Sequence, residues 1–557
     1  MLRLVYFRSR AAGYDPCRRL SILSRASSTS SEYEHFYRYT SGRWIHNEEA
    51  QLAARYTRFN VDALKSIAVS AGHADSVTRI VKLAEGAYNK VFLLTLDNSR
   101  EIIARIKTPH AGPAHLVTAS EVATMDFVRS RLGVPVPAVL SWSSHSEQTP
   151  VEAEYIIMEK APGIEVSTVW DKLSRRQQRE LVINWLEIEK RLMAPISGGY
   201  GSLYYRADVD PSQSLNLYPN DEYQSDFVVG PSVERPFWSD ERSSMDVDRG
   251  PWEDPLSYVL AVANCERRWI EKHAVPAQES GLFDLPVHLR QPRAHLSLLD
   301  RYIAVAPYLV PQDPPLLRPL LWHNDVRFAN VFASEEALAR GEVQITSVID
   351  WQHTTLLPLY LQAYVPKMFR YHGTTVLPAG DQLLSLPENL NTLDEEDQAT
   401  VKADVYRGNL HKLYEIYCAR INPEYHKALT LATRELIHYP VKFSAKVWSS
   451  TFMLLREFLM RITAHWDAIA PGASVPCPIS FTEEERQAHL EEREDWQRAQ
   501  DGKDGLDRIL GVDADGWVTE EGYEEAVRRN WELQEGYVRM GAEDPERVLR
   551  NWPYRPR

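Results

Sequence analysis

Three polar side chains in the second half of the chain have the types and the spacing that magnesium chemistry and proton transfer require. Asp325 and Asn330 lie within the stretch Leu-Trp-His-Asn-Asp-Val-Arg-Phe-Ala-Asn (321–330), and Asp350 follows the apolar, β-branched run 343–349. Mg²⁺ prefers oxygen ligands and keeps several waters, so one amide and one or two carboxylates are enough to hold it. These residues therefore predict a site in which Asp325 accepts a proton while Asn330 and Asp350 bind the metal.

The Asp-x-x-x-x-Asn spacing also has a purely structural interpretation, in which Asp325 and Asn330 cap the turn of a β-hairpin. The spacing alone would be common by chance. The preceding His323, the β-like segments on either side and the downstream Asp350 favour the functional interpretation, because the spacing is that of a kinase catalytic loop. We interpret His323 as a residue that holds the loop, since Asp325 is the better proton acceptor.

A second set of candidate residues lies nearer the N-terminus. Gly86 falls between two predicted strands, where the absence of a Cβ would let the backbone approach phosphate groups, although any hairpin could contain such a glycine. Arg105 and Lys107 are two residues apart on a predicted strand and so share a face. Either cation could meet nucleotide phosphates and pair with Glu121 on the following helix. The alternative is an exposed cationic strand face, and the sequence leaves this choice open.

The elements that must position these side chains form two groups. Residues 36–160 alternate short β-branched runs with turns and include an amphipathic helix, which predicts a small β-rich lobe. Residues 161–480 are largely helical and contain a long irregular insertion at about 200–255, rich in Pro, Asp, Ser and Trp. Residues 481–557 are dense in charge and predict helices packed on the larger lobe. The order predicts an α+β fold of two lobes.

The composition argues against several classes of function. A formal net charge of −14 disfavours nucleic-acid binding through a basic surface. No apolar stretch reaches about 18 residues, the length that a transmembrane helix needs. The four cysteines show no C-x-x-C pairing, which disfavours a zinc site and a disulfide framework. We therefore expect no nucleic-acid partner and no transmembrane segment.

The beginning of the chain differs from the rest. It combines arginines with apolar residues and a Ser-rich run, and Asp15 is its only acidic residue before Glu32. Such an Arg- and Ser-rich, acid-poor and amphipathic start is typical of a mitochondrial presequence. The alternative is an unstructured tail without a targeting role. We predict a presequence over residues 1–35 and a mitochondrial location.

Several longer motifs resemble the aminoglycoside phosphotransferase (APH) family of kinase-like folds, and more closely its fungal branch, the altered inheritance of mitochondria protein 9 family. They include Tyr-Thr-Ser-Gly-Arg-Trp (39–44), Glu-Gly-Ala-Tyr-Asn (85–89), Met-Glu-Lys-Ala-Pro-Gly (158–163), Ile-Asp-Trp-Gln (349–352) and Trp-Pro-Tyr (552–554). With the catalytic stretch, the resemblance covers nearly everything from about residue 36 onward.

The resemblance implies a bilobal protein kinase-like fold with ATP and Mg²⁺ bound between a small β-rich lobe and a large α-helical lobe. It implies Asp325 as the catalytic base and Asn330 and Asp350 as the Mg²⁺ ligands. Arg105 stands where the phosphate-pairing lysine usually is, and Glu121 where its helix partner is. We assign further nucleotide-binding roles to residues of the glycine loop, the neighbouring strand and the hinge: Gly86, Asn89, Lys107, Met158 and Glu159.

The sequence thus predicts transfer of the γ-phosphate of ATP to the hydroxyl group of an unknown small molecule. The alternative is a catalytically weak or inactive kinase-like scaffold for mitochondrial maintenance or inheritance. Retention of Asp325, Asn330 and Asp350 favours catalysis, whereas the arginine at position 105 favours the scaffold, because its reach and geometry differ from those of lysine. A protein kinase is less well supported, since no Ala-Pro-Glu landmark follows Asp350.

Overall fold

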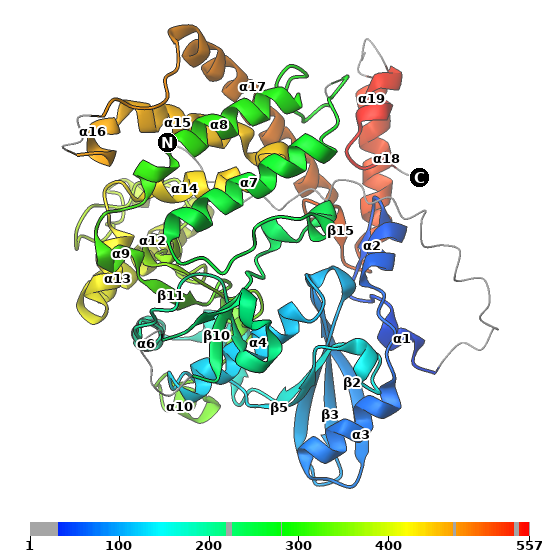
Figure 1. Ribbon diagram of the computed structural model, residues 1–557. Coiled ribbons are helices and arrows are strands. Elements are labelled where there is room, and N and C mark those ends of the chain that lie inside the picture. The colour runs from blue at the N-terminus through cyan, green and yellow to red at the C-terminus, as the bar shows by residue number, and fades with distance from the viewer. Residues whose placement is uncertain (1–31, 219–224, 280, 472–474, 540–544, 556–557) are drawn as a thin grey trace.

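The computed structural model describes five stretches of the chain: 32–218, 225–279, 281–471, 475–539 and 545–555. Residues 1–31 of the expected presequence lie outside them. Figure 1 shows two lobes, a sheet lobe in blue and cyan and a larger helical lobe in green to orange. The expected α+β, bilobal, kinase-like architecture is confirmed. No helix in the described part of the chain is both long enough and apolar enough to cross a membrane.

The N-terminal lobe is built on one antiparallel sheet. Its strands, in spatial order, are β2 (Val77–Glu85), β3 (Asn89–Leu96), β4 (Glu101–Lys107), β6 (Tyr155–Glu159) and β5 (Val139–Ser143). Along β3, buried and partly exposed residues alternate, as expected for a strand with one face on a core. The buried face, with Phe92 and Ile102, packs against α3 (Val61–Gly72). This packing fixes the strands that carry the glycine loop and Arg105.

Helix α4 (Leu116–Ser130) joins the two lobes. Residues around most of its circumference are buried, and Val122 and Phe127 belong to the large core of the C-terminal lobe. It also packs against β8 (Ser202–Tyr205) of the insertion. A helix held on several sides cannot easily rotate, so the position of Glu121 on it is set by the packing of both lobes.

The C-terminal lobe is mainly helical. Its longer helices are α6 (Arg175–Leu192), α7 (Pro255–His273), α8 (Pro292–Leu309), α12 (Glu395–Ile421), α14 (Arg434–Ser444) and α15 (Phe452–Ala464). Local sequence sets where they begin: Ser174 and Gln177 form a capping box that starts α6, in which each side chain accepts a hydrogen bond from the other's backbone N–H.

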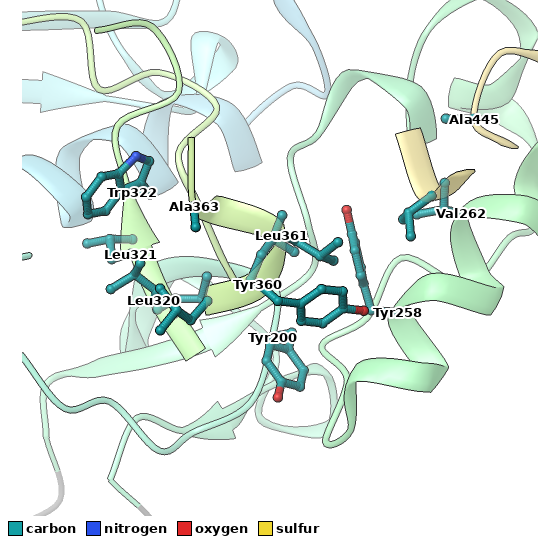
Figure 2. Packing of buried hydrophobic residues seen from close by; sticks show 14 of the residues in the cluster. Tyr200, Tyr258, Val262, Leu320, Leu321, Trp322, Tyr360, Leu361, Ala363 and Ala445 are labelled. Carbon is teal, nitrogen blue, oxygen red and sulfur yellow. The ribbon is translucent and has the colours of Figure 1, made fainter. Parts of the chain in front are cut away.

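Two small antiparallel sheets support the segment 321–330. β11 (Pro319–Trp322) pairs with β14 (Thr355–Pro358), and β12 (Val331–Ala333) pairs with both β13 (Ile345–Val348) and β7 (Ile164–Glu165). Figure 2 shows the buried side chains of β11 in one packed core with Tyr360, Leu361 and Tyr258. Because β11 is anchored in this core, the loop that follows it starts from a fixed point.

The expected insertion is ordered where the structure describes it. β8, β10 (Phe227–Gly230) and β9 (Leu215–Asn216) form a small antiparallel sheet. Gly201 bridges to Leu356 of β14, which fastens this sheet to the β11–β14 pair. The insertion therefore reaches the neighbourhood of the candidate site.

The charged C-terminal extension contacts both lobes. Its helix α17 (Glu483–Leu510) packs on α15, where His489 Nε2 lies 2.7 Å from an oxygen of Glu457. Its strand β15 (Trp517–Val518) pairs with β1 (Arg43–Trp44) near the start of the described chain. In Figure 1, α18 (Tyr523–Arg539) accordingly stands near α2 (Glu48–Arg55). The sequence predicted the packing on the C-terminal lobe but gave no indication of the pairing with β1.

Candidate active site

His323 organises the loop that carries Asp325. The backbone N–H of Asp325 donates to Nδ1 of His323 at 3.1 Å, so that nitrogen carries no proton, and Nε2 donates to the carbonyl oxygen of Ile349 at 2.9 Å. Burial lowers the pKa of His323, which agrees with this neutral form. The side chain therefore ties the Asp325 loop to the strand that leads to Asp350 and is not placed as a base.

Asn330 and Asp350 lie across from each other where the β12–β13 hairpin ends. The N–H of Ile349 donates to the carbonyl oxygen of Asn330 at 3.0 Å. The Asn330 side-chain amide nitrogen donates to the carbonyl oxygen of Asp325 at 2.9 Å, which leaves the amide oxygen as the group that can face a cation. Asp350 adopts a φ of +68°, a strained conformation for a residue with a Cβ and one that recurs at functional sites. This oxygen set fits Mg²⁺.

Arg105 links the N-terminal lobe to the segment that carries Asp350. Its guanidinium forms an ion pair with Glu121, and its Nη2 lies 3.6 Å from Oδ1 of Asp350. The side chains of Arg105 and Glu121 are 10% and 2% exposed, so this contact is made out of water. Burial disfavours the charge of Arg105, but the attraction of Glu121 and Asp350 outweighs it and raises its pKa. With the side-chain amide of Asn89 oriented to satisfy its partners, its oxygen accepts from Nη2 at 2.6 Å.

Lys107 is engaged elsewhere. Its Nζ lies 2.7 Å from Oε1 of Glu154 and donates to the carbonyl oxygen of Pro113 at 3.2 Å. Glu154 also accepts from the hydroxyl of Thr118 at 2.6 Å. The structure thus separates the two cations that the sequence could not distinguish: Arg105 pairs with Glu121, and Lys107 pairs with a different buried carboxylate.

The glycine loop is open on one side and held on the other. Gly86 is exposed, and apart from its two neighbours in the chain no atom of the described residues lies within 4 Å of the position that a Cβ would occupy there. The preceding Glu85 is buried, with Lys90 Nζ 2.6 Å from its Oε1 and the N–H of Thr40 2.6 Å from its Oε2. The loop therefore offers free backbone at Gly86 while its base is fixed to the N-terminal segment.

Tyr88 at the tip of this loop meets two other parts of the chain. Its ring lies 5.4 Å from that of His353, three residues after Asp350, and the guanidinium of Arg235 in the insertion lies 4.5 Å from its centroid. The side-chain amide of Asn89 lies 2.9 Å from that of Gln352. The glycine loop, the insertion and the Asp350 segment therefore meet at one place.

The two hinge residues lie at the end of β6. Met158 is buried and stands opposite Ile103 of β4 in the sheet. Glu159 is partly exposed, and its Oε2 accepts from the N–H of Ala138 at 3.0 Å. Both residues thus lie where the chain passes from one lobe to the other.

Two basic side chains that the sequence interpretation did not include hold Asp325. Lys367 Nζ lies 2.7 Å from Oδ1, and Arg327 Nε lies 3.0 Å from Oδ2. Burial would raise the pKa of Asp325, but these two cations outweigh it and hold the pKa below its usual value. Arg327 could have been found from its place in the motif, two residues after Asp325. Lys367 carries no local signal, because it lies 42 residues further on.

The chain is similar to known proteins over most of its length. The model of the phosphotransferase enzyme family, APH, matches residues 79–360. A subtelomeric hrmA-associated cluster protein of Aspergillus fumigatus is 34% identical over 510 residues, which cover 86% of this chain and 96% of that protein. Altered inheritance of mitochondria protein 9 of Yarrowia lipolytica is 24% identical over 498 residues, which cover 83% of this chain and 82% of that protein.

Among solved structures, macrolide 2'-phosphotransferase of Brachybacterium faecium aligns with 74% of this chain and 100% of its own at 12% identity and a TM-score of 0.32, a value too low to transfer any detail of a site. The family model, which spans half of the chain, and the 34% identity to the A. fumigatus protein carry the assignment. They confirm the resemblance drawn from the motifs: the chain belongs to the APH phosphotransferase family.

Proposed function

We propose that this protein is a mitochondrial, ATP- and Mg²⁺-dependent phosphotransferase that acts on a hydroxyl group of a small molecule. The observation that carries the proposal is the contact of Arg105 with both Glu121 and Asp350, made next to the Asp325–Asn330 loop. A cation beside the phosphates, oxygen ligands for the metal and a carboxylate near the acceptor are the parts that phosphoryl transfer needs.

Each residue has one task in this proposal. Arg105 contributes positive charge at the nucleotide phosphates, and the exposed backbone at Gly86 lies over them. Asn330 and Asp350 would hold Mg²⁺, which when bound neutralises charge on the phosphoryl oxygens. The acceptor oxygen forms a bond to the γ-phosphorus, the bond from that phosphorus to the β,γ-bridging oxygen breaks, and Asp325 takes the hydroxyl proton.

The mitochondrial location is supported by two independent features. The Y. lipolytica relative carries the word mitochondrial in its name. The first 35 residues of this chain have the composition of a presequence. A fluorescent protein fused after residue 557 should therefore enter mitochondria, and deletion of residues 1–35 should leave the fusion in the cytosol. Unchanged import after the deletion would contradict a targeting role for this segment.

The activity is tested first through binding. At a concentration of Mg-ATP about a hundredfold above Kd, binding to the folded state alone should stabilise it by about 2.7 kcal/mol, which a thermal unfolding scan detects. Asp350→Ala should abolish this shift because it removes a metal ligand. Asp381→Ala is the matched control, since Asp381 lies on an exposed loop segment. The absence of any shift at millimolar Mg-ATP would favour a kinase-like scaffold.

A further inference from the structure

Four cations gather on segments that follow Asp350 in the chain. We call them the cationic cluster: Lys367, Arg370, Arg434 and Lys442. Two of them lie near one aromatic ring, because the guanidinium of Arg370 is 5.4 Å and the ammonium of Lys442 is 5.6 Å from the centroid of Tyr364. Arg434 donates from Nη2 to the carbonyl oxygen of the residue before Tyr364 at 2.6 Å. The four cations thus share one small region.

The cluster reaches the proton-accepting carboxylate. Lys367 Nζ lies 2.7 Å from Oδ1 of Asp325. The hydroxyl of Tyr364 donates to the carbonyl oxygen of His323 at 3.2 Å, which ties the centre of the cluster to the same loop. Arg105, in contrast, contacts Asp350 from the N-terminal lobe. The cationic cluster therefore contacts Asp325 from the C-terminal lobe, whereas Arg105, the cation proposed to bind the nucleotide phosphates, contacts Asp350 from the N-terminal lobe.

Lys442 is an exposed member of the cationic cluster. Its side chain is exposed to solvent, and among the described residues no carboxylate oxygen lies within 4.0 Å of its ammonium. The protein packed around it, together with the repulsion of Arg370, Arg434 and Lys367, lowers its pKa to about 8. Lys442 is consequently still protonated at pH 7 and accessible to a solute.

Among the described residues, one carboxylate does most to favour the charged form of Lys442. It is Glu234 of the insertion, which accepts from the hydroxyls of Ser232 at 3.1 Å and Tyr258 at 3.2 Å. Burial outweighs these hydrogen bonds and the attraction of Lys442, and it raises the pKa of Glu234 to about 7. Near neutral pH, Glu234 is therefore only about half ionised, and the cations of this region outnumber its negative charges.

We propose that the acceptor is an anionic hydroxyl compound whose phosphate or carboxylate group binds the cationic cluster while its hydroxyl faces Asp325. This inference rests on the proposed phosphotransfer and names its substrate class. Guanidinium and ammonium groups recognise both kinds of anion through charge-assisted hydrogen bonds. A polycationic acceptor, by contrast, would be repelled by Lys442 and its neighbours. The transfer yields a product with one more phosphate group, ADP and a proton.

The test uses the full chain, γ-labelled ATP, Mg²⁺ and a metabolite extract of mitochondria freed of nucleotides on charcoal. Anion exchange divides the extract into a bound, anionic fraction and an unbound, neutral and cationic fraction. We expect Asp325-dependent label in new products from the bound fraction only. Label from the unbound fraction would overturn the anionic acceptor and leave the phosphotransferase standing. No label from either fraction, together with no thermal shift by Mg-ATP, would overturn both.

Variants then separate acceptor binding from nucleotide binding. Lys442→Gln should raise KM for the labelled anionic acceptor at least tenfold, with little change in kcat and an unchanged thermal shift by Mg-ATP. Lys442→Arg should restore most of the affinity. Lys427→Gln is the matched control, because Lys427 is an exposed lysine of α13 (Pro423–Leu429) that pairs with Asp313. An unaltered KM in Lys442→Gln, or a parallel fall in the Mg-ATP shift, would overturn the assignment.

Discussion

Three buried cations of the N-terminal lobe and the cationic cluster of the C-terminal lobe differ in how their charge is compensated. In the N-terminal lobe three buried cations pair with buried carboxylates: Lys90 with Glu85, Arg105 with Glu121 and Lys107 with Glu154. In the C-terminal lobe the cationic cluster brings four positive charges together, with Asp325 beside Lys367 and Glu234 acting on Lys442. Paired buried charges hold the side chains of the folded protein in place without a ligand. A group of like charges, in contrast, can bind a ligand of the opposite charge. The comparison predicts that substitutions of the paired cations reduce stability, whereas substitutions in the cationic cluster change KM for the acceptor.

The largest effect is expected on folding, in the N-terminal lobe. Arg105→Met leaves Glu121, which is 2% exposed, as a buried carboxylate without its partner. Breaking a buried pair in this way costs about 3–5 kcal/mol of stability. Chemical denaturation should show this loss. Arg407→Met is the control, because that side chain is 65% exposed and should lose less than about 1 kcal/mol. Equal stability of both variants would contradict a structural role for the paired cations.

The next largest effect is expected on turnover, from a substitution of Asp325 that leaves the paired cations of the N-terminal lobe unchanged. Asp325→Asn keeps the size of the side chain but removes the proton acceptor, so kcat should fall roughly a hundredfold or more. The thermal shift caused by Mg-ATP should persist, since Arg105, Asn330 and Asp350 are untouched. A simultaneous and equal loss of nucleotide binding would show that Asp325 acts in binding and is not the base.

A smaller effect is expected when the pH is changed, because Lys442 and Glu234 both titrate near neutral pH. Lys442, whose pKa is lowered to about 8, loses its proton as the pH rises from 7 to 9. Over the same range Glu234, whose pKa is raised to about 7, becomes fully ionised. Arg370 and Arg434 keep their charge, and Asp325 stays ionised because its pKa is lowered. Both changes oppose an anion, so KM for the acceptor should rise with pH. In Lys442→Arg most of this rise should disappear.

The smallest effect is expected from removing the negative charge of Glu234. Glu234→Gln keeps a side chain that accepts from Tyr258 and Ser232 but removes the negative charge facing Lys442. Because Glu234 acts on the acceptor from a distance, we expect the removal of its charge to change the binding free energy by roughly 1 kcal/mol. KM for an anionic acceptor at pH 8.5 should therefore fall by about two- to fivefold. An increase in KM would mean that Glu234 itself binds the acceptor.

Local signals in the sequence were enough to predict the frame of the site. The spacing of Asp325, Asn330 and Asp350 and the alternation along β4 identified residues that the fold brings together, because each lies at the end of a short, recognisable element. The partner of Lys107 could not be predicted, since Glu154 lies across a sheet whose register the sequence does not specify. Lys367 reaches Asp325, and Lys442 reaches Tyr364, through tertiary packing of segments that are distant in the chain. No local sequence pattern signals such contacts.

The pairing of β15 with β1 has a consequence for the synthesis of the protein. Trp44 and Asp515, whose side chains meet beside these strands, are separated by 471 residues, and the same N-terminal segment supplies Thr40 to Glu85 at the base of the glycine loop. Contacts of such sequence separation form late, and domains emerge from the ribosome N-terminus first. The N-terminal lobe is translated first, but the segment that supports its glycine loop gains its pairing with β15 only after β15 has been synthesised. A nascent chain cut anywhere before β15 should bind Mg-ATP weakly or not at all.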